Sequence, residues 1–316
     1  MIEVVVTSRN TEAQGICSYE LTCAQGNPLP AFSAGAHIDV HLPGGLVRQY
    51  SLCNHPQERH RYLIGVLKDE ASRGGSHSLH EQVMQGQCLH ISEPRNLFAL
   101  VPHAQRSLLF AGGIGITPIL CMAEQLAADG ADFELHYCAR SSERAAFVQR
   151  LKNSPFADRV HLHFDEQAET RLDAAKVLAQ PQAGQHLYVC GPAGFMQHVL
   201  QSAAAQGWPD AQLHREYFAA APVDTSADGV FSVRLASSGQ VYEVPADKSV
   251  VQVLQSHGVE VAISCEQGVC GTCLTGVLEG VPEHRDMYLT EQEQAANDQF
   301  TPCCSRAKSA LLVLDL

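Results

Sequence analysis

The stretch Cys265–Cys273, CEQGVCGTC, decides the fold of the C-terminal part of the chain, because it carries three cysteines in the spacing C-x4-C-x2-C. A fourth cysteine, Cys303, follows after 29 further residues. This spacing is typical of plant-type [2Fe–2S] sites, in which four thiolates hold two bridged irons. Structural zinc prefers paired C-x2-C units, and disulfides fit a reducing compartment poorly. The pattern therefore predicts a [2Fe–2S] cluster with Cys265, Cys270, Cys273 and Cys303 as its metal ligands.

Two glycines, Gly268 and Gly271, lie between these cysteines. Three ligands from one loop must converge on a small cluster. Glycine lets the backbone fold closely over it, and the amides can point at the sulfurs. Cys304 directly follows Cys303 and competes with it for the fourth position. The interval favours Cys303, which leaves Cys304 as a packed thiol.

Composition narrows the class of protein. With 316 residues the chain is too long for one core, so we expect two or three domains. Its 34 acidic and 21 basic residues give a net charge of −13, which argues against a nucleic-acid or anionic-membrane surface. The first residues lack the basic and apolar segments of a signal peptide, and no apolar run is long enough to span a membrane. We expect a cytoplasmic protein with no nucleic-acid or membrane partner.

The pattern of apolar runs, turn residues and helical stretches along the sequence predicts a multidomain protein with both β and α/β parts. Residues 1–102 contain short apolar or alternating runs separated by Asn, Gly and Pro, which predicts an antiparallel β-barrel. Residues 103–220 alternate apolar strands with helical stretches, which predicts a parallel α/β domain. Residues 221–228 have the composition of a linker. Residues 229–316 contain the four predicted cluster ligands and form the expected ferredoxin domain.

Two motifs in the α/β domain follow the ends of predicted strands. AGGIGITP, residues 111–118, is a strand, a glycine turn and a helix start, with Thr117 as helix cap and Pro118 in the first helical position. YVCGP, residues 188–192, ends another strand. Open α/β sheets bind ligands at the carboxyl ends of their strands, so both motifs suit a dinucleotide. Neither matches G-x-G-x-x-G, and a tight turn would also explain each of them.

A flavin is expected because nicotinamide delivers electrons in pairs and the cluster takes them singly. In RQYSLCN, residues 48–54, Arg48 is placed to meet a phosphate, Tyr50 to pack on the flavin and Ser51 to bond its N5 edge. In SRGGSHSLHEQV, Gly74, Gly75 and Ser76 precede a predicted helix, whose N-terminus attracts anions. A barrel strand and a serine-capped turn would produce the same patterns.

Taken in order, these motifs resemble the phthalate dioxygenase reductase family, within the ferredoxin–NADP reductase superfamily, over nearly the whole chain. More narrowly, the sequence is similar to the reductase components of vanillate O-demethylases. The resemblance implies a flavin-binding β-barrel, a nicotinamide-binding α/β domain and a C-terminal β-grasp ferredoxin. It also implies FMN rather than FAD, NADH as electron donor and a Rieske-type terminal oxygenase component as partner in aromatic catabolism.

The resemblance assigns roles residue by residue. Ser51, Cys190 and Phe218 match catalytic positions, where Phe218 is the aromatic that stacks on the flavin. Arg48, Tyr50, Ser51, Gly74, Gly75 and Ser76 match the flavin site; Gly113, Gly115, Thr117, Arg140, Gly191 and Pro192 match the nicotinamide site. A cation and a hydroxyl at Arg140, Ser141 and Arg144 would also suit a 2′-phosphate, so NADPH stays open.

The expected activity is electron transfer by an NAD(P)H-dependent flavin iron–sulfur oxidoreductase. A reductase of a different oxygenase, or a stand-alone ferredoxin-type reductase, is the alternative. A redox sensor or a zinc-binding protein belongs to a different class, and the zinc version would be colourless and would not oxidise NADH.

Overall fold

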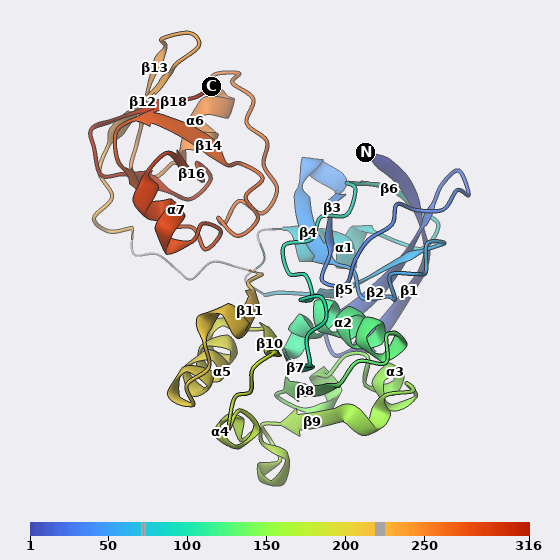
Figure 1. The fold of residues 1–316 in the computed structure, drawn as a ribbon. Coiled ribbons are helices and arrows are strands. Elements are labelled where there is room, and N and C mark those ends of the chain that lie inside the picture. Colours follow the sequence, from blue (N-terminus) through green and yellow to red (C-terminus); the bar gives the residue numbers. More distant parts are fainter. Residues whose placement is uncertain (71, 73, 219–224) are drawn as a thin grey trace. The chain divides into compact units, whose positions relative to one another are not determined.

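The computed structural model describes residues 1–70, 72, 74–218 and 225–316, which form two compact units, Met1–Glu216 and Tyr217–Leu316 (Figure 1). Within these described residues, no helix is long and apolar enough to cross a membrane.

The first unit begins with a closed antiparallel barrel. Its strands are β1 (Ile2–Ala13), β2 (Ile16–Cys23), β3 (His37–His41), β4 (Val47–Ser51), β5 (Tyr62–Leu67) and β6 (Cys88–Ile91), paired in the order β4-β3-β6-β1-β2-β5. A bridge between Leu52 and Ile64 joins the two edge strands and closes the barrel. Helix α1 (Gly75–Gln82) lies between β5 and β6 in sequence. The expected antiparallel barrel is confirmed.

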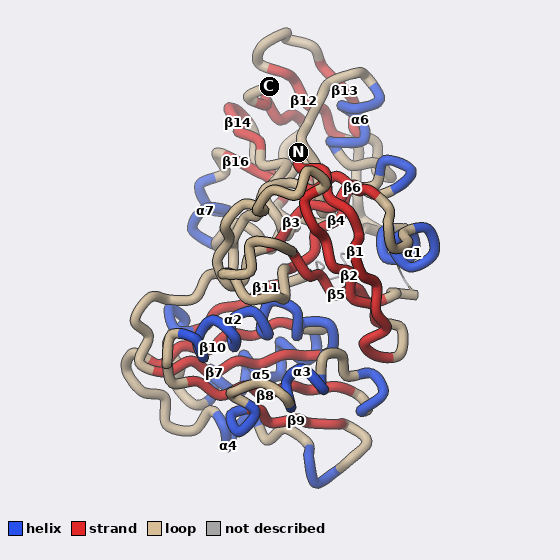
Figure 2. Tube along the Cα trace, turned by 90° about the vertical axis from the view of Figure 1, so that its right-hand side faces the viewer, coloured by secondary structure: helices blue, strands red, loops and turns tan. Residues whose placement is uncertain are grey.

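The rest of the first unit is a five-stranded parallel sheet. Its strands are β7 (Arg106–Gly112), β8 (Phe133–Ala139), β9 (Val160–Phe164), β10 (Gln185–Cys190) and β11 (Leu213–Glu216), in the order β11-β10-β7-β8-β9 (Figure 2). Its helices are α2 (Ile116–Ala128), α3 (Val148–Lys152), α4 (Ala174–Val177) and α5 (Ala193–Ala205). The chain first adds strands on one side of β7 and later on the other. The topological switch therefore lies between β7 and β10, where such sheets bind ligands.

The start of α2 corrects one prediction. The helix begins at Ile116 with Gly115 as its N-cap, so Thr117 and Pro118 are its second and third residues. A 3₁₀ turn at Gly113–Gly115 leads straight into the helix, which moves the cap two residues earlier than expected. Thr117 is buried, and its hydroxyl donates a hydrogen bond to the carbonyl oxygen of Ile114 at 3.0 Å. The prediction that Thr117 caps the helix is wrong.

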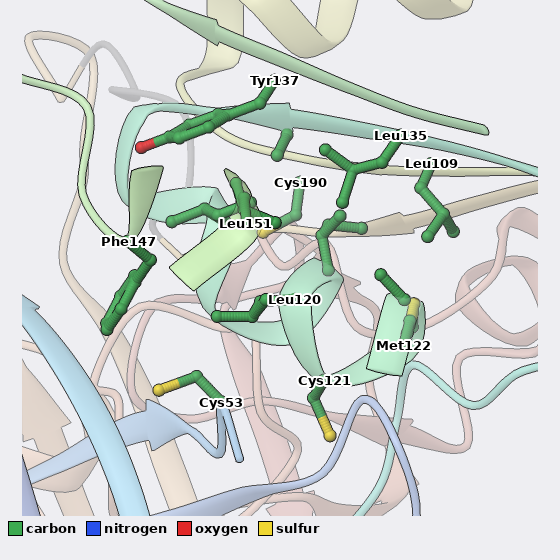
Figure 3. Close-up of a cluster of buried hydrophobic side chains, with 14 of the residues drawn as sticks. Cys53, Leu109, Leu120, Cys121, Met122, Leu135, Tyr137, Phe147, Leu151 and Cys190 are labelled. Atoms are coloured by element: carbon green, nitrogen blue, oxygen red, sulfur yellow. The ribbon is translucent and has the colours of Figure 1, made fainter. Parts of the chain in front are cut away.

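One hydrophobic cluster joins the barrel to the parallel sheet, and the barrel has a second cluster of its own. Figure 3 shows Cys53 of the barrel beside Leu120 and Cys121 of α2, and all three side chains are fully buried. A Cβ on Gly65 of β5 would lie 2.8 Å from Cγ2 of Thr117, so barrel and helix are in direct contact. The boundary expected at residue 102 stays a prediction.

The opposite face of the parallel sheet is polar along β8 and β9. His136 of β8 lies in register with Phe110 of β7 and His161 of β9, and its ring stacks on both. Burial, with the neighbouring His161 and His163, lowers the pKa of His136 to about 3. The buried ring is therefore uncharged at neutral pH.

The second unit is a small mixed sheet with a helix packed on it. The elements are β12 (Phe231–Leu235), β13 (Val241–Val244), α6 (Val250–Ser256), β14 (Thr275–Glu279), β15 (Pro282–Glu283), α7 (Glu291–Ala296), β16 (Gln299–Phe300), β17 (Arg306–Ala307) and β18 (Leu311–Leu314). The main sheet has the order β13-β12-β18-β14-β16, with β12 and β18 parallel. Ser249 caps α6 through a capping box with Gln252. The expected β-grasp ferredoxin architecture is confirmed.

A buried ion-pair cluster fixes the start of the second unit. Asp228 accepts a hydrogen bond from Nη1 of Arg285 at 2.9 Å and lies 3.5 Å from Nε of Arg306. Asp228 was assigned to the linker 221–228, of which residues 221–224 lie outside the described residues. The linker bounds therefore stay a prediction.

Candidate functional site

The two glycine motifs of the α/β domain lie against each other at the topological switch. Strands β7 and β10 are neighbours, with Ala111 opposite Cys190. A Cβ on Gly115 would lie 2.2 Å from the carbonyl oxygen of Cys190, and one on Gly191 would lie 2.9 Å from Cα of Gly112. Only glycine allows this approach. The result is a crevice edge made of backbone, which suits a dinucleotide.

Gly113 and Pro192 lie on the outer side of this edge. Gly113 has a left-handed φ of 52°, and a Cβ there would have no atom within 4 Å. Pro192 is exposed and is the N-cap residue of α5. Both predicted nicotinamide positions are therefore accessible at the carboxyl end of the sheet.

The end of the next strand, β8, carries charges of both signs. Arg140 and Arg144 are exposed and Ser141 is buried. Bonds from its own backbone amide and from the hydroxyls of Ser141 and Ser142 lower the pKa of Glu143, so its carboxylate is charged at neutral pH. The loop thus contains both arginines that could bind the 2′-phosphate of NADPH and a carboxylate, Glu143, that could bind the ribose 2′-hydroxyl of NADH.

The predicted flavin-phosphate residues meet at the N-terminus of α1. A Cβ on Gly75 would lie 2.4 Å from Cγ of Arg48, so the arginine stem of β4 packs directly on the first turn of the helix. Gly74 is its N-cap residue and has a left-handed φ of 92°. The hydroxyl of Ser76 accepts a hydrogen bond from the Asp69 amide at 3.2 Å. A guanidinium beside the N-terminus of a helix is a favourable place for a phosphate.

Ser51, Cys190 and Glu216 converge from the barrel and the parallel sheet. The Ser51 hydroxyl at the end of β4 donates a hydrogen bond to Oε2 of Glu216 at 3.3 Å. Glu216 is the last residue of β11 and lies in register with Cys190. Burial raises the pKa of Glu216 to about 8, although the Ser51 bond opposes this shift. Burial, and next the carboxylate of Glu216, raise the pKa of the Cys190 thiol, which therefore stays protonated.

Glu216 was not predicted as a site residue from the sequence. Its position depends on β11 pairing with β10, which no local motif announces. Burial also raises the pKa of Tyr50, so its phenol is neutral. Phe218 belongs to the second unit and its side chain is 40% exposed. Its predicted contact with the flavin stays a prediction.

The four predicted cluster ligands lie within hydrogen-bonding reach of one another. Bonds with Cys270 and Cys303 lower the pKa of Cys265 to about 2, and a bond with Cys303 also lowers the pKa of Cys273. The amides of Gln267 and Thr272 donate to the sulfurs of Cys265 and Cys270, each at 3.4 Å. The same bonds raise the pKa of Cys270 and Cys303. Four thiols that lie close together, two of which accept backbone amide bonds, match the donor set that a [2Fe–2S] cluster requires.

The neighbouring thiols Cys303 and Cys304 have different surroundings. Cys303 bonds with Cys265 and Cys273, which are both predicted ligands. Cys304 lies 3.2 Å from Oγ1 of Thr301. A Cβ on Gly268 would lie 2.4 Å from the Cys304 sulfur, so this thiol packs against the ligand loop. The geometry favours Cys303 as the fourth ligand.

Comparisons with known proteins agree with this architecture. Residues 233–308 match the family described as "2Fe-2S iron-sulfur cluster binding domain", and residues 92–213 match the "Dimethylamine monooxygenase subunit DmmA-like, N-terminal domain". The chain is 74% identical to vanillate O-demethylase oxidoreductase of Pseudomonas putida, and the alignment covers 100% of both. The chain belongs to the oxygenase reductase family.

Two further relatives support this membership. The reductase is 43% identical to the phthalate 4,5-dioxygenase reductase subunit of Pseudomonas putida, over 98% of this chain and 95% of the relative. A solved phthalate dioxygenase reductase superposes with a TM-score of 0.80 at 41% identity, covering 100% of this chain and 98% of that one. The expected family, its three-part fold, its oxidoreductase class and its iron–sulfur domain are confirmed.

The cluster loop allows a matched test of its glycines. Gly268 has a left-handed φ of 69°, and a Cβ there would lie 2.9 Å from Cα of Asp286 as well as against Cys304. We expect Gly268→Ala to lose most of the iron and the iron–sulfur absorbance of the purified protein. Gly258→Ala is the control, because Gly258 has a φ of 77° but open space around it. Equal iron content in the two variants would contradict the close packing inferred for the loop.

The raised pKa of Glu216 predicts a pH-dependent effect on stability. A carboxyl group whose pKa is raised by folding stabilises the folded state below its unfolded value of 4.5, and this contribution is lost as the pH rises to about 8. Glu216→Gln has no such ionisation. We expect its Tm, relative to the parent protein, to rise from pH 4.5 to 8 and to level off above that.

Thermal unfolding at fixed ionic strength measures this difference. The control is Glu169→Gln, which changes an exposed carboxylate of the same unit. A Tm difference for Glu216→Gln that stays constant between pH 5 and pH 8 would show that the carboxyl is not buried as described.

Proposed function

We propose that the reductase takes electrons from NADH through FMN and its [2Fe–2S] cluster and delivers them to a Rieske-type terminal oxygenase. The observation that carries this proposal is the convergence of Ser51, Cys190 and Glu216, because it joins the flavin strand to the nicotinamide edge. The cytoplasm, where NADH is available, is the compartment in which we propose that it acts.

In this proposal Arg48 and the amides at the start of α1 hold the terminal phosphate of FMN, since the arginine stem lies on Gly75. When bound, a flavin would accept one hydride, which carries two electrons, and release these electrons one at a time. A phosphate held at this point requires no adenine-binding segment, which favours FMN over FAD. Tyr50, neutral and largely buried on the same strand, supplies an apolar face for the ligand.

Ser51, Cys190 and Glu216 position the two reacting rings rather than exchange protons with them. The Ser51 hydroxyl stays oriented because it donates a hydrogen bond to Oε2 of Glu216 at 3.3 Å. The Cys190 thiol is neutral and fully buried, so the end of β10 adds no charge at the switch point. An uncharged surface favours close stacking of a nicotinamide, and hydride transfer depends chiefly on this alignment.

NADH is favoured over NADPH by Glu143. Its carboxylate lies in the loop after β8, bonded to Ser141 and Ser142, and would repel a 2′-phosphate. Arg140 and Arg144 in the same loop are exposed and can accompany the diphosphate or the adenosine of either nucleotide.

The second unit holds the outlet of the electrons. Cys265, Cys270, Cys273 and Cys303 would bind the cluster, and amides from Gln267 and Thr272 would stabilise its negative charge. Cys304 packs against Gly268 of this loop. The predicted role of Phe218, stacking on the flavin, is part of the proposal.

The partner and its substrate follow from the relatives. Vanillate O-demethylase oxidoreductases of two Pseudomonas strains share 74% and 61% identity over the full chain, so we propose a vanillate O-demethylase as the system served. A net charge of −13 suits electrostatic association with a basic face of the oxygenase. A reductase of another oxygenase, or a stand-alone ferredoxin-type reductase, remains the alternative.

The adjacent thiols provide a matched pair for testing this division of roles. We expect Cys303→Ser to reduce the NADH-dependent reduction of cytochrome c at least tenfold, because cytochrome c takes single electrons from the cluster. Ferricyanide, which accepts electrons from the flavin, should still be reduced at nearly the parent rate. Both rates are read optically in anaerobic assays of the same FMN-loaded preparation.

Cys304→Ser is the control and should keep both activities and its iron. Loss of ferricyanide reduction in Cys303→Ser with FMN still bound would contradict the proposed electron path. Loss of iron from Cys304→Ser but not from Cys303→Ser would instead reassign the fourth ligand and leave the path intact.

A further inference from the structure

Three potential metal ligands meet on the polar face of the parallel sheet, away from the switch-point crevice. Glu134 and His136 lie two residues apart on β8, and His161 lies beside His136 on β9. One ligand atom from each lies within 4.8 Å of the other two. None of these residues belongs to the flavin, nicotinamide or cluster sites described above.

His136 presents a buried nitrogen that lacks a hydrogen-bond partner. Its side chain is about 5% exposed, and among the described residues nothing donates to or accepts from its Nε2 atom. Buried polar atoms are almost always satisfied in folded proteins, so an exception indicates a missing ligand. This nitrogen faces Glu134, with Oε2 at 3.5 Å.

The hydrogen bonds behind the ring determine which form of His136 is present. The carbonyl oxygen of Thr170 can only accept, so Nδ1 of His163 donates to it at 2.7 Å. Nε2 of a neutral His163 then accepts from Nδ1 of His136 at 3.0 Å. His136 therefore carries its proton on Nδ1 and leaves Nε2 unprotonated, 3.5 Å from Oε2 of Glu134. Metal-binding histidines are oriented in this way by a partner on their other nitrogen.

Two electron-rich atoms thus lie close together, a buried imidazole nitrogen without a proton and an oxygen of the partly exposed Glu134 carboxylate. This arrangement is unfavourable unless a cation lies between them. We propose that Glu134, His136 and His161 bind a divalent transition-metal ion of the zinc type on the outer face of the nicotinamide domain.

The chemistry of the three side chains suits zinc better than calcium or magnesium. Two imidazoles and one carboxylate are a known ligand set for Zn²⁺ with one open position, whereas Ca²⁺ and Mg²⁺ prefer oxygen ligands. Arg106 binds Oε1 of Glu134 at 2.6 Å, which fixes the carboxylate and leaves Oε2 directed at His136. The Arg106 guanidinium also offsets the negative charge of Glu134, so we expect the affinity of the site for Zn²⁺ to be moderate.

Binding requires a modest movement of one exposed side chain. The rings of His136 and His161 are stacked at 4.8 Å with planes 18° apart, so one ring must tilt before both nitrogens point at one ion. His161 is exposed and can make that movement, which also gives the ion access from solvent. A bound ion would join the edge strand β9 to β8, the strand that leads to Arg140.

The test uses untagged, FMN- and cluster-loaded protein, since empty cluster thiols would themselves bind zinc. Equilibrium dialysis against Zn²⁺ at pH 7.5, with zinc counted per two irons, should find one bound zinc ion per chain in the parent protein. His161→Asn should weaken this binding by on the order of tenfold or more, and Glu134→Gln should also weaken it. Zinc should raise the Tm of the parent but not of His161→Asn.

His198→Asn is the matched control, because His198 is an exposed histidine of α5 in the same unit. It should bind zinc as the parent does. Equal zinc binding by the parent and His161→Asn, or no zinc bound by the cluster-loaded parent, would overturn the proposal and leave a simple histidine stack. Neither result would bear on NADH oxidation, which is measured separately on each sample.

Discussion

The first unit depends on the close approach of two backbone turns at the topological switch. Gly115 touches the carbonyl group of Cys190, and Gly191 touches Gly112, with no room for a side chain at either contact. This packing brings the end of β10 against the start of α2. Because Thr117 in α2 also touches Gly65 of the barrel, the same helix aligns the barrel with the sheet.

A second consequence of this packing is the placement of Ser51 beside Glu216. Ser51 belongs to the barrel and Glu216 to the last strand of the parallel sheet. Their hydrogen bond therefore forms only when the barrel and the sheet are correctly packed together. Glu216 is partly buried, and this burial raises the pKa of its carboxyl group and favours the protonated form. The surface on which flavin and nicotinamide are proposed to meet is thus largely uncharged, and alignment of the rings rather than proton transfer is the contribution of the protein.

Sequence alone predicted the features that depend on local spacing. Three of the four predicted cysteine ligands lie in one loop. Gly268 and Gly271 in this loop have left-handed φ values, as expected for a backbone that folds closely around a cluster. Short motifs predicted Arg48 and Gly75 separately as flavin-site residues. Their contact arises because α1 packs against β4 of the barrel. Features set by strand order were not predictable. Glu216 and the Glu134–His136–His161 group depend on which strands pair, and the cap of α2 depends on a 3₁₀ turn.

The most direct test of the account is the visible spectrum of the purified full-length protein before and after anaerobic addition of NADH. The account predicts flavin bands on a broad iron–sulfur absorption, both bleached by NADH. A protein that stays colourless after reconstitution with FMN, iron and sulfide would contradict it.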